Sequence, residues 1–142
     1  MDIIALRGNS DVGKSETLNI VYQFMLLFGY IQAPPGPRHF RILGNRIQKD
    51  FIDILEKKGR RIGIATMGDY ARGPESVANL LSYLDGQHCD KAICACNITL
   101  PGTVNAVTAY LNHQILDKTV TAVAAEQRIR NGEDAERIYR LI

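Results

Sequence analysis

Short apolar runs alternate with amphipathic segments along the chain. Residues 3–7 form an apolar run that ends at Gly8 and is typical of a buried strand, whereas apolar residues from Lys14 to Phe28 recur at helical spacing. The same two patterns predict the remaining elements. Strands are expected at 38–43, 61–67, 91–96 and 119–124, and helices between Asn45 and Gly59, between Pro74 and Gly86, after Thr103 and from Glu126 onward.

This alternation predicts the fold class, because strands that alternate with helices form a parallel sheet with helices on both faces. We therefore expect a three-layer α/β fold with about five mainly parallel strands, in one domain spanning 1–142. Ligands of such sheets bind beyond the carboxyl ends of the strands. We therefore expect the residues that bind a ligand in the segments 8–15, 68–73 and 97–103.

In two of the predicted helices, particular residues mark an end or a break. Asn45 is a plausible cap for the first of them, and Gly59 a plausible end. Its buried face would consist of Ile47, Phe51, Ile54 and Leu55. In the last helix, Asn131 and Gly132 are candidates for a break.

Composition excludes several classes of protein. No run approaches the about 18 apolar residues of a membrane span, and the apolar run at the N-terminus is too short for a signal peptide. The net charge of +2 does not fit a general nucleic-acid binder. Cysteines number three, and Cys94 and Cys96 are expected side by side in a buried strand, which argues against a disulfide framework and for the cytoplasm.

Charge is nevertheless concentrated in one segment. Residues 38–61 hold eight basic side chains against three acidic ones, so this segment carries +5 and the rest of the chain −3. Either an anionic ligand binds near it, or it is a solvated helix end.

The segment Gly8–Ser15, GNSDVGKS, fits the pattern G-x-x-x-x-G-K-S in full and lies between a predicted strand and a predicted helix. Gly8 and Gly13 would let backbone N–H groups surround a polyphosphate. On these residues the chain resembles P-loop NTPases, with this segment as the Walker A motif and an order of strands and helices that extends the resemblance to nearly the whole chain.

The resemblance implies ATP or another nucleoside triphosphate, bound with Mg²⁺. Lys14 would then lie between the β- and γ-phosphates, and Ser15 would offer its hydroxyl to Mg²⁺. The residues expected to contact the nucleotide are Gly8, Asn9, Ser10, Asp11, Val12, Gly13, Lys14, Ser15, Glu16 and Asn97.

The resemblance also implies an aspartate, after a second strand, that helps to hold Mg²⁺. Residues 62–69, IGIATMGD, are similar to the Walker B pattern, with Asp69 as the Mg²⁺ ligand and Gly68 interrupting the apolar run. A turn residue is the alternative interpretation of Asp69. Tyr70 stands where many of these ATPases carry a catalytic glutamate, so fast hydrolysis by the chain alone is not expected.

Two branches of the family are distinguished by further motifs. GTPases read guanine with Asn-Lys-x-Asp, which is missing at 94–99, and Asp69–Gly73 is one residue longer than their Asp-x-x-Gly, so a GTPase is less favoured. Small nucleoside and nucleotide kinases are similar in length and layout, and they bring arginines to the phosphates. Arg72, with Arg38, Arg41 or Arg46, is the candidate here; surface arginines paired with acids are the alternative.

The remaining polar candidates have simpler alternatives. Asn97 resembles the polar sensor position of some P-loop ATPases, but an asparagine before Pro101 and Gly102 also fits a turn. The group His88, Cys89, Cys94 and Cys96 lacks the paired spacing of zinc sites, which favours buried apolar cysteines. His39 and His113 show no partners in the sequence and are expected on the surface.

These residues predict Mg²⁺-dependent binding of ATP or another nucleoside triphosphate, with phosphoryl transfer or slow hydrolysis. Lys14, Asp69 and Arg72 would carry the catalysis, and a small anionic molecule would be the acceptor of a kinase reaction. A nucleotide-dependent switch or adaptor, whose 70–74 loop contacts a protein partner, is the alternative. Neither a membrane nor nucleic acid is an expected partner.

Overall fold

The computed structural model describes residues 1–34, 36, 38–44 and 49–142. Strands occupy β1 (Asp2–Gly8), β2 (Ile31–Gln32), β3 (Arg41–Leu43), β4 (Asp50–Lys57), β5 (Arg60–Ala65), β6 (Lys91–Asn97) and β7 (His113–Asp117). Helices occupy α1 (Lys14–Leu27), α2 (Val77–Gly86), α3 (Pro101–Thr108) and α4 (Ala124–Tyr139).

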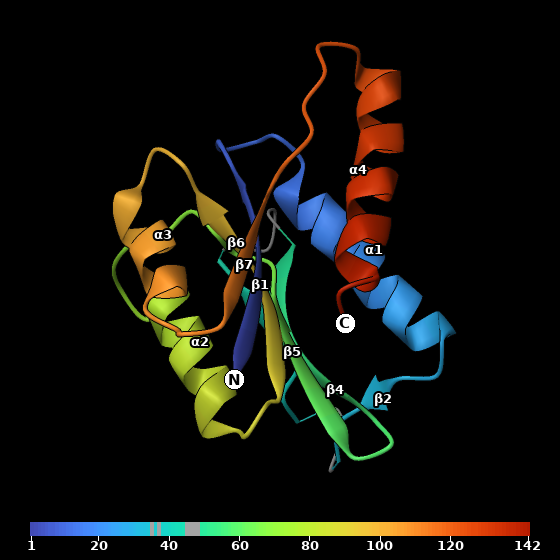
Figure 1. Cartoon of the computed structure of the whole chain (residues 1–142), viewed down its shortest axis with the longest axis vertical. Helices are drawn as coiled ribbons and strands as arrows, with labels where there is room; N and C mark the ends of the chain where they lie inside the picture. Colours follow the sequence, from blue (N-terminus) through green and yellow to red (C-terminus); the bar gives the residue numbers. More distant parts are fainter. Residues whose placement is uncertain (35, 37, 45–48) are drawn as a thin grey trace.

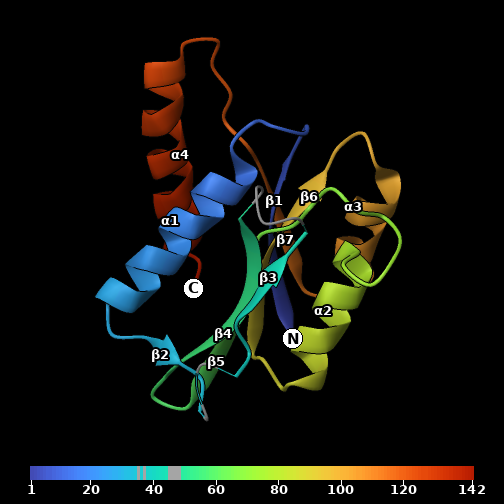
Figure 2. The ribbon, with the colours of Figure 1, turned by 180° about the vertical axis from the view of Figure 1, so that it is seen from behind.

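All of these strands belong to one sheet, in the order β2-β4-β5-β6-β1-β7, and β3 also pairs with β4. The strands β5, β6, β1 and β7 run parallel to one another. By contrast, β4 runs antiparallel to β5, and β2 and β3 run antiparallel to β4 (Figure 2). The expectation of about five mainly parallel strands is therefore wrong: the described part of the chain forms a mixed sheet of seven strands.

The largest local error of the sequence interpretation is the helix expected between Asn45 and Gly59. Residues 50–57 form β4 instead, and Asn45 and Ile47 lie outside the described residues. The first six residues of β4 are buried, and a short apolar run buried on both faces carries no periodicity that separates strand from helix. Gly59, taken as a helix end, belongs to the tight turn between β4 and β5.

The strand expected at 119–124 is also misplaced. The edge strand β7 occupies 113–117, where only Ile115 and Leu116 are strongly apolar, and it pairs with β1 through five residues. The helix expected after Thr103 occupies Pro101–Thr108, and Leu111 beyond it is 95% exposed. Pairing with β1 decides the position of this strand, and no local pattern in the sequence records that pairing.

The expected helices α1 and α2 are confirmed. The α2 helix begins after Ser76, whose Oγ accepts a hydrogen bond from the N–H of Asn79 at 3.2 Å, and it buries Leu80, Leu81 and Leu84. The last helix, α4, is continuous through Asn131 and Gly132, so the break considered there is absent. Burial explains this, because Asn131 is 1% exposed and held against α1 and the loop before it.

Two helices cover each face of the sheet, as Figure 1 shows. Alternate residues of a strand point to opposite faces. In β1, Ile4 and Leu6 pack under α1 and α4, whereas Ile3 and Ala5 pack under α2 and α3. Because β1 is central and buried on both faces, the loop that follows it is held in a fixed position at the carboxyl edge of the sheet.

Candidate functional site

The Gly8–Ser15 loop joins β1 to α1 and takes its shape from two glycines. Gly13 is the N-cap of α1 with φ 89°, a left-handed conformation that favours glycine, and its carbonyl accepts hydrogen bonds from both N–H and Oγ1 of Thr17. At Gly8, a Cβ atom would meet Val12 at 3.0 Å and Lys118 at 3.1 Å. The pattern read from the sequence therefore corresponds to a tightly wrapped loop at the start of a helix.

Lys14 lies almost entirely inside this loop, with 4% of its surface exposed. Its Nζ donates to the carbonyls of Gly8 at 3.1 Å and Asn9 at 2.5 Å, and pairs with Asp69 Oδ1 at 3.2 Å. The ammonium group is thus held by the loop itself and by one carboxylate beyond β5. Lys14 and Asp69, predicted from separate motifs, are in direct contact.

Gly68 explains how Asp69 reaches this position. A Cβ atom at Gly68 would lie 2.5 Å from the Cβ of Ala95, so only glycine lets the chain after β5 pass this close to β6. Asp69 then accepts a hydrogen bond from Asn97 Nδ2 at 2.8 Å, and its side chain is 40% exposed. The glycine that interrupts the expected apolar run therefore serves the close packing beside Asp69.

Asn97 joins three segments at the end of β6. Its Nδ2 donates to Ser10 Oγ at 3.0 Å as well as to Asp69. Its Oδ1 accepts from both N–H and Oγ1 of Thr99. One end of the amide therefore forms a turn, as one interpretation of the sequence expected, and the other end contacts Ser10 and Asp69.

Asp50 is an acid of the site that the sequence interpretation missed. Because β4 is antiparallel to β5, its first residue lies at the carboxyl end of β5, where Thr66 Oγ1 donates to Asp50 Oδ1 at 2.7 Å. The backbone carbonyl of Thr66 is 3.4 Å from Ser15 Oγ. Recognising the turn at Lys58 and Gly59 would have indicated a hairpin and placed Asp50 at this edge.

A cavity of about 560 Å³ lies over the loop, and we refer to it as the loop cavity. Its lining comprises Asp11, Val12, Gly13, Lys14, Ser15, Glu16, Asp50, Asp69, Val120, Thr121, Ala122, Ala124, Gln127 and Asn131. Among these described residues there are four carboxylates and one ammonium group, so an anionic ligand would need an accompanying cation.

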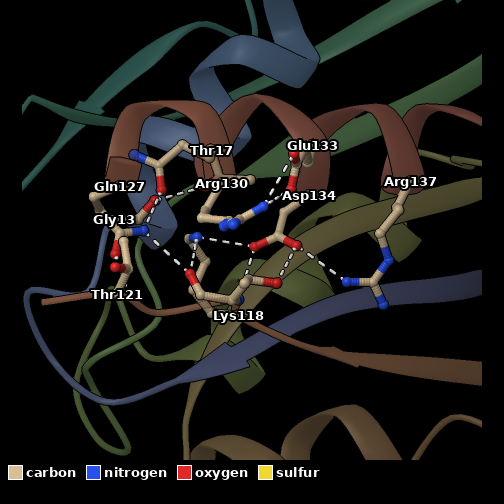
Figure 3. A network of polar contacts seen from close by, with 11 residues as sticks. Gly13, Thr17, Lys118, Thr121, Gln127, Arg130, Glu133, Asp134 and Arg137 are labelled. Atoms are coloured by element: carbon tan, nitrogen blue, oxygen red, sulfur yellow. Dashed lines mark hydrogen bonds and ion pairs between the residues drawn. The ribbon is translucent and has the colours of Figure 1, made fainter. Parts of the chain in front are cut away.

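One wall of the loop cavity comes from α4 and the segment before it, in contacts that no sequence motif indicated (Figure 3). Asn131 Oδ1 accepts from Gln127 Nε2 at 2.9 Å, and the amide of Asn131 packs directly against Gly13. Asn131 Nδ2 is shielded from solvent and has no hydrogen-bond partner. This wall therefore presents a buried donor beside the glycine of the loop.

A buried ion pair fixes this wall to β7. Lys118 Nζ lies 2.9 Å from Asp134 Oδ2, and both side chains are at most 2% exposed. Asp134 also accepts from the N–H and Oγ1 of Thr119 and pairs with Arg137 at 3.0 Å. Burial alone would raise the pKa of Asp134, but the hydrogen bonds from Lys118 and Thr119 hold that pKa below its ordinary value.

The candidate arginines lie elsewhere. Arg72 lines a separate hollow beside α2, and the guanidinium of Arg41 stacks 4.7 Å from the ring centre of Tyr83. Arg38 lines a third hollow, with Tyr83 in its wall, and Arg46 is outside the described residues. Within the described part of the chain, no arginine lines the loop cavity.

The three cysteines are buried, as expected, and all are free thiols. Burial raises the pKa of Cys96 to about 11, against the opposing effect of the Arg7 and Lys14 charges. Burial also raises the pKa of Cys94. These thiols therefore stay protonated at neutral pH. Among the described residues, no group of three or more His, Cys, Asp or Glu side chains is arranged to hold a metal ion by itself.

Comparison with known proteins gives no relative: no protein-family model, curated protein or solved structure matches the chain. In the described part of the chain, every helix is too short or too polar to span a membrane.

Proposed function

We propose that the chain binds a Mg²⁺-bound nucleoside triphosphate, with ATP as the first candidate, in the loop cavity and hydrolyses its terminal phosphate slowly. The observation that carries this proposal is the contact of Lys14 with Asp69 and the Gly8–Ser15 loop, at the mouth of one cavity. The first turn of α1 supplies free backbone N–H groups there, and a helix N-terminus favours a bound anion.

The orphaned amide of Asn131 supports a ligand rich in oxygen atoms. A buried N–H group without an acceptor costs free energy, about 1–3 kcal/mol for a neutral donor. Asn131 Nδ2 is such a donor, and it lies beside Gly13 in a residue that lines the loop cavity. A phosphate oxygen near Gly13 would satisfy it.

The roles of the remaining residues follow from their positions. Lys14 would exchange the loop carbonyls for phosphate oxygens, and Ser15 and Asp69 would hold Mg²⁺. The metal would supply charge neutralisation, which the four carboxylates of the cavity make necessary. Asn97 would orient Asp69 and Ser10 toward one another.

Slow turnover fits the groups present. Tyr70, not a glutamate, follows Asp69, and among the described acids that line the cavity only Asp50 is buried. The positions of Arg38, Arg41 and Arg72 weaken the kinase hypothesis, since none lines the loop cavity. A nucleotide-dependent switch is the second candidate. Tyr70, directly after Asp69, is 41% exposed, so a protein partner that contacts Tyr70 would sense whether nucleotide is bound at Asp69. Three free, buried thiols fit the reducing cytoplasm.

Calorimetric titration with ATP and Mg²⁺ tests the site. Replacing Lys14 by Ala removes a charge-assisted contact, so we expect about ten- to hundredfold weaker binding. Arg60→Ala, an exposed cation at the opposite end of β5, is the charge-matched control and should bind as the wild type does. Equal affinity of wild type and Lys14→Ala would refute the nucleotide site.

Turnover of the same proteins tests the metal ligand. Asp69→Asn should reduce Mg²⁺-dependent hydrolysis while leaving Mg²⁺-free ATP binding at least as tight, because it removes a negative charge from the cavity. Asp50→Asn is the comparison, since Asp50 lines the same cavity. If turnover depends on Asp50 and not on Asp69, then Asp69 is a loop residue and the metal is held elsewhere.

A further inference from the structure

The basic segment 38–61 contributes to the third hollow, which is separate from the loop cavity. This hollow has a volume of about 440 Å³ and is lined by Pro34, Arg38, His39, Arg61, Tyr83 and Gln87. Arg61 is the second residue of β5, whereas Asp69 follows the other end of that strand. The two cavities therefore lie at opposite ends of the sheet.

Arg61 is the central group of this hollow. Its Nε is shielded from solvent and has no hydrogen-bond partner. Within the described residues, no carboxylate lies within ion-pair distance of the side chains of Arg61, Arg38 or Arg41. A buried guanidinium N–H without an acceptor is costly, so an acceptor from outside the chain is expected here.

Neighbouring side chains hold Arg61 in place. His39, expected on the surface, is 8% exposed, and its Nε2 lies 3.4 Å from Arg61 Nη2. Since a guanidinium only donates, His39 Nε2 is the acceptor and Nδ1 carries the proton, which it donates to Tyr83 Oη at 2.8 Å. The phenolic hydrogen of Tyr83 is thereby left free to donate. Burial and the charge of Arg61 lower the pKa of His39, which agrees with a neutral imidazole.

We propose that this hollow binds the phosphate group of a small phosphorylated molecule. Arg61 lines the hollow, and its guanidinium carries the fixed fork of donors that matches two oxygens of a phosphate. Arg38 adds a second positive charge, and Tyr83 and Gln87 add neutral donors. A dianion with three free oxygens matches this set better than a carboxylate does. The volume of the hollow exceeds that of a bare phosphate and falls in the range of binding sites for small molecules.

Backbone amide NMR titration can resolve this site from the loop cavity, where phosphate also binds if the proposed function is correct. The probes are inorganic phosphate, glycerol 3-phosphate and succinate. With wild-type protein, both phosphate probes should shift the amides of Tyr83 and Gln87. We expect Arg61→Gln to weaken the titration read at Gln87 at least tenfold, and to leave any titration read at Gly13 unchanged.

Three further variants make the result specific. Arg60→Gln removes the exposed neighbouring charge on β5 and should titrate at Gln87 as the wild type does. Tyr83→Phe keeps the ring and should weaken binding by severalfold, and Lys14→Ala should affect only the titration read at Gly13. Absence of phosphate-induced shifts at Tyr83 and Gln87, or wild-type binding by Arg61→Gln, would overturn the proposal. Tighter binding of succinate than of glycerol 3-phosphate would overturn the choice of phosphate.

Discussion

At the scale of single residues, two constraints act on Gly13: its left-handed backbone conformation and the close approach of Asn131. No other residue of the Gly8–Ser15 loop combines a left-handed glycine with such a contact. The φ of 89° at Gly13 is strained for any residue with a Cβ, and a Cβ there would lie 2.8 Å from Asn131 Oδ1. Only the first constraint acts on Gly73, because its φ is 90° and nothing lies within 4 Å of its Cβ position. Alanine substitutions at Gly73 and Gly13 therefore separate the cost of backbone strain from the cost of steric contact.

We predict that Gly73→Ala lowers the free energy of unfolding by about 1–2 kcal/mol, the cost of a left-handed conformation. Gly13→Ala should lower it further, because Asn131 is buried and its Oδ1 is held by Gln127. A double-mutant cycle measured by urea denaturation separates the two costs. In the Asn131→Ala background, Gly13→Ala should lose only the free energy due to backbone strain, because the contact with Asn131 is gone. Additive effects of the two substitutions would show that Asn131 does not press on Gly13.

Single residues also show which parts of the site could be predicted from the sequence. Lys14 and Ser15 are fixed by a contiguous pattern that includes its own turn and helix start, so local information suffices. Asp50 and Asn131 reach the same cavity from segments 30 or more residues away, through strand pairing and helix packing. Such contacts leave no local signal, and both residues were missed.

At the scale of elements, the error at β4 has a definite physical cause. Lys58 and Gly59 have φ of 52° and 76°, the pair of left-handed residues that a tight antiparallel hairpin requires. Asp53, a charged residue inside the strand, is buried because Tyr22 and Gln32 donate to it at 2.9 and 3.0 Å. Apolar spacing records neither fact, and an antiparallel extension of the sheet was therefore interpreted as a helix.

The attachment of α4 to the segment after β7 is an element-scale feature with a pH dependence. Asp134→Asn leaves Lys118 buried without its counter-charge, so we predict a loss of about 3–5 kcal/mol of unfolding free energy at pH 7. The folded pKa of Asp134 is lowered, so its stabilisation is present above the unfolded pKa of about 3.9 and is lost as the pH falls through the folded pKa.

The gap in stability between wild type and Asp134→Asn should accordingly narrow below about pH 5, measured by urea denaturation at several pH values. Glu133→Gln is the control on the same helix, because its ion pair with Arg130 is exposed (Figure 3). It should change stability little at any pH. A gap that stays constant down to pH 3 would mean that Asp134 does not act through its charge.

At the scale of the whole molecule, the sheet separates two cavities that share no lining residue. The loop cavity lies where β1, β5 and β6 end, whereas the hollow lined by Arg61 lies where β5 begins. The buried parallel strands between them belong to both cores, and a ligand at either end stabilises the same folded state. If each site is independent, the two stabilising free energies add.

We therefore predict additive thermal shifts for the two ligands. A non-hydrolysable ATP analogue with Mg²⁺, at about 100 times its Kd, should contribute about 2.7 kcal/mol and raise the Tm by several degrees. With the loop cavity thus filled, glycerol 3-phosphate should raise the Tm again in the wild type and in Arg60→Gln, but not in Arg61→Gln. Differential scanning calorimetry measures both steps. If the second rise vanishes once the analogue is bound, glycerol 3-phosphate competes for the loop cavity and the hollow at Arg61 is not a separate site.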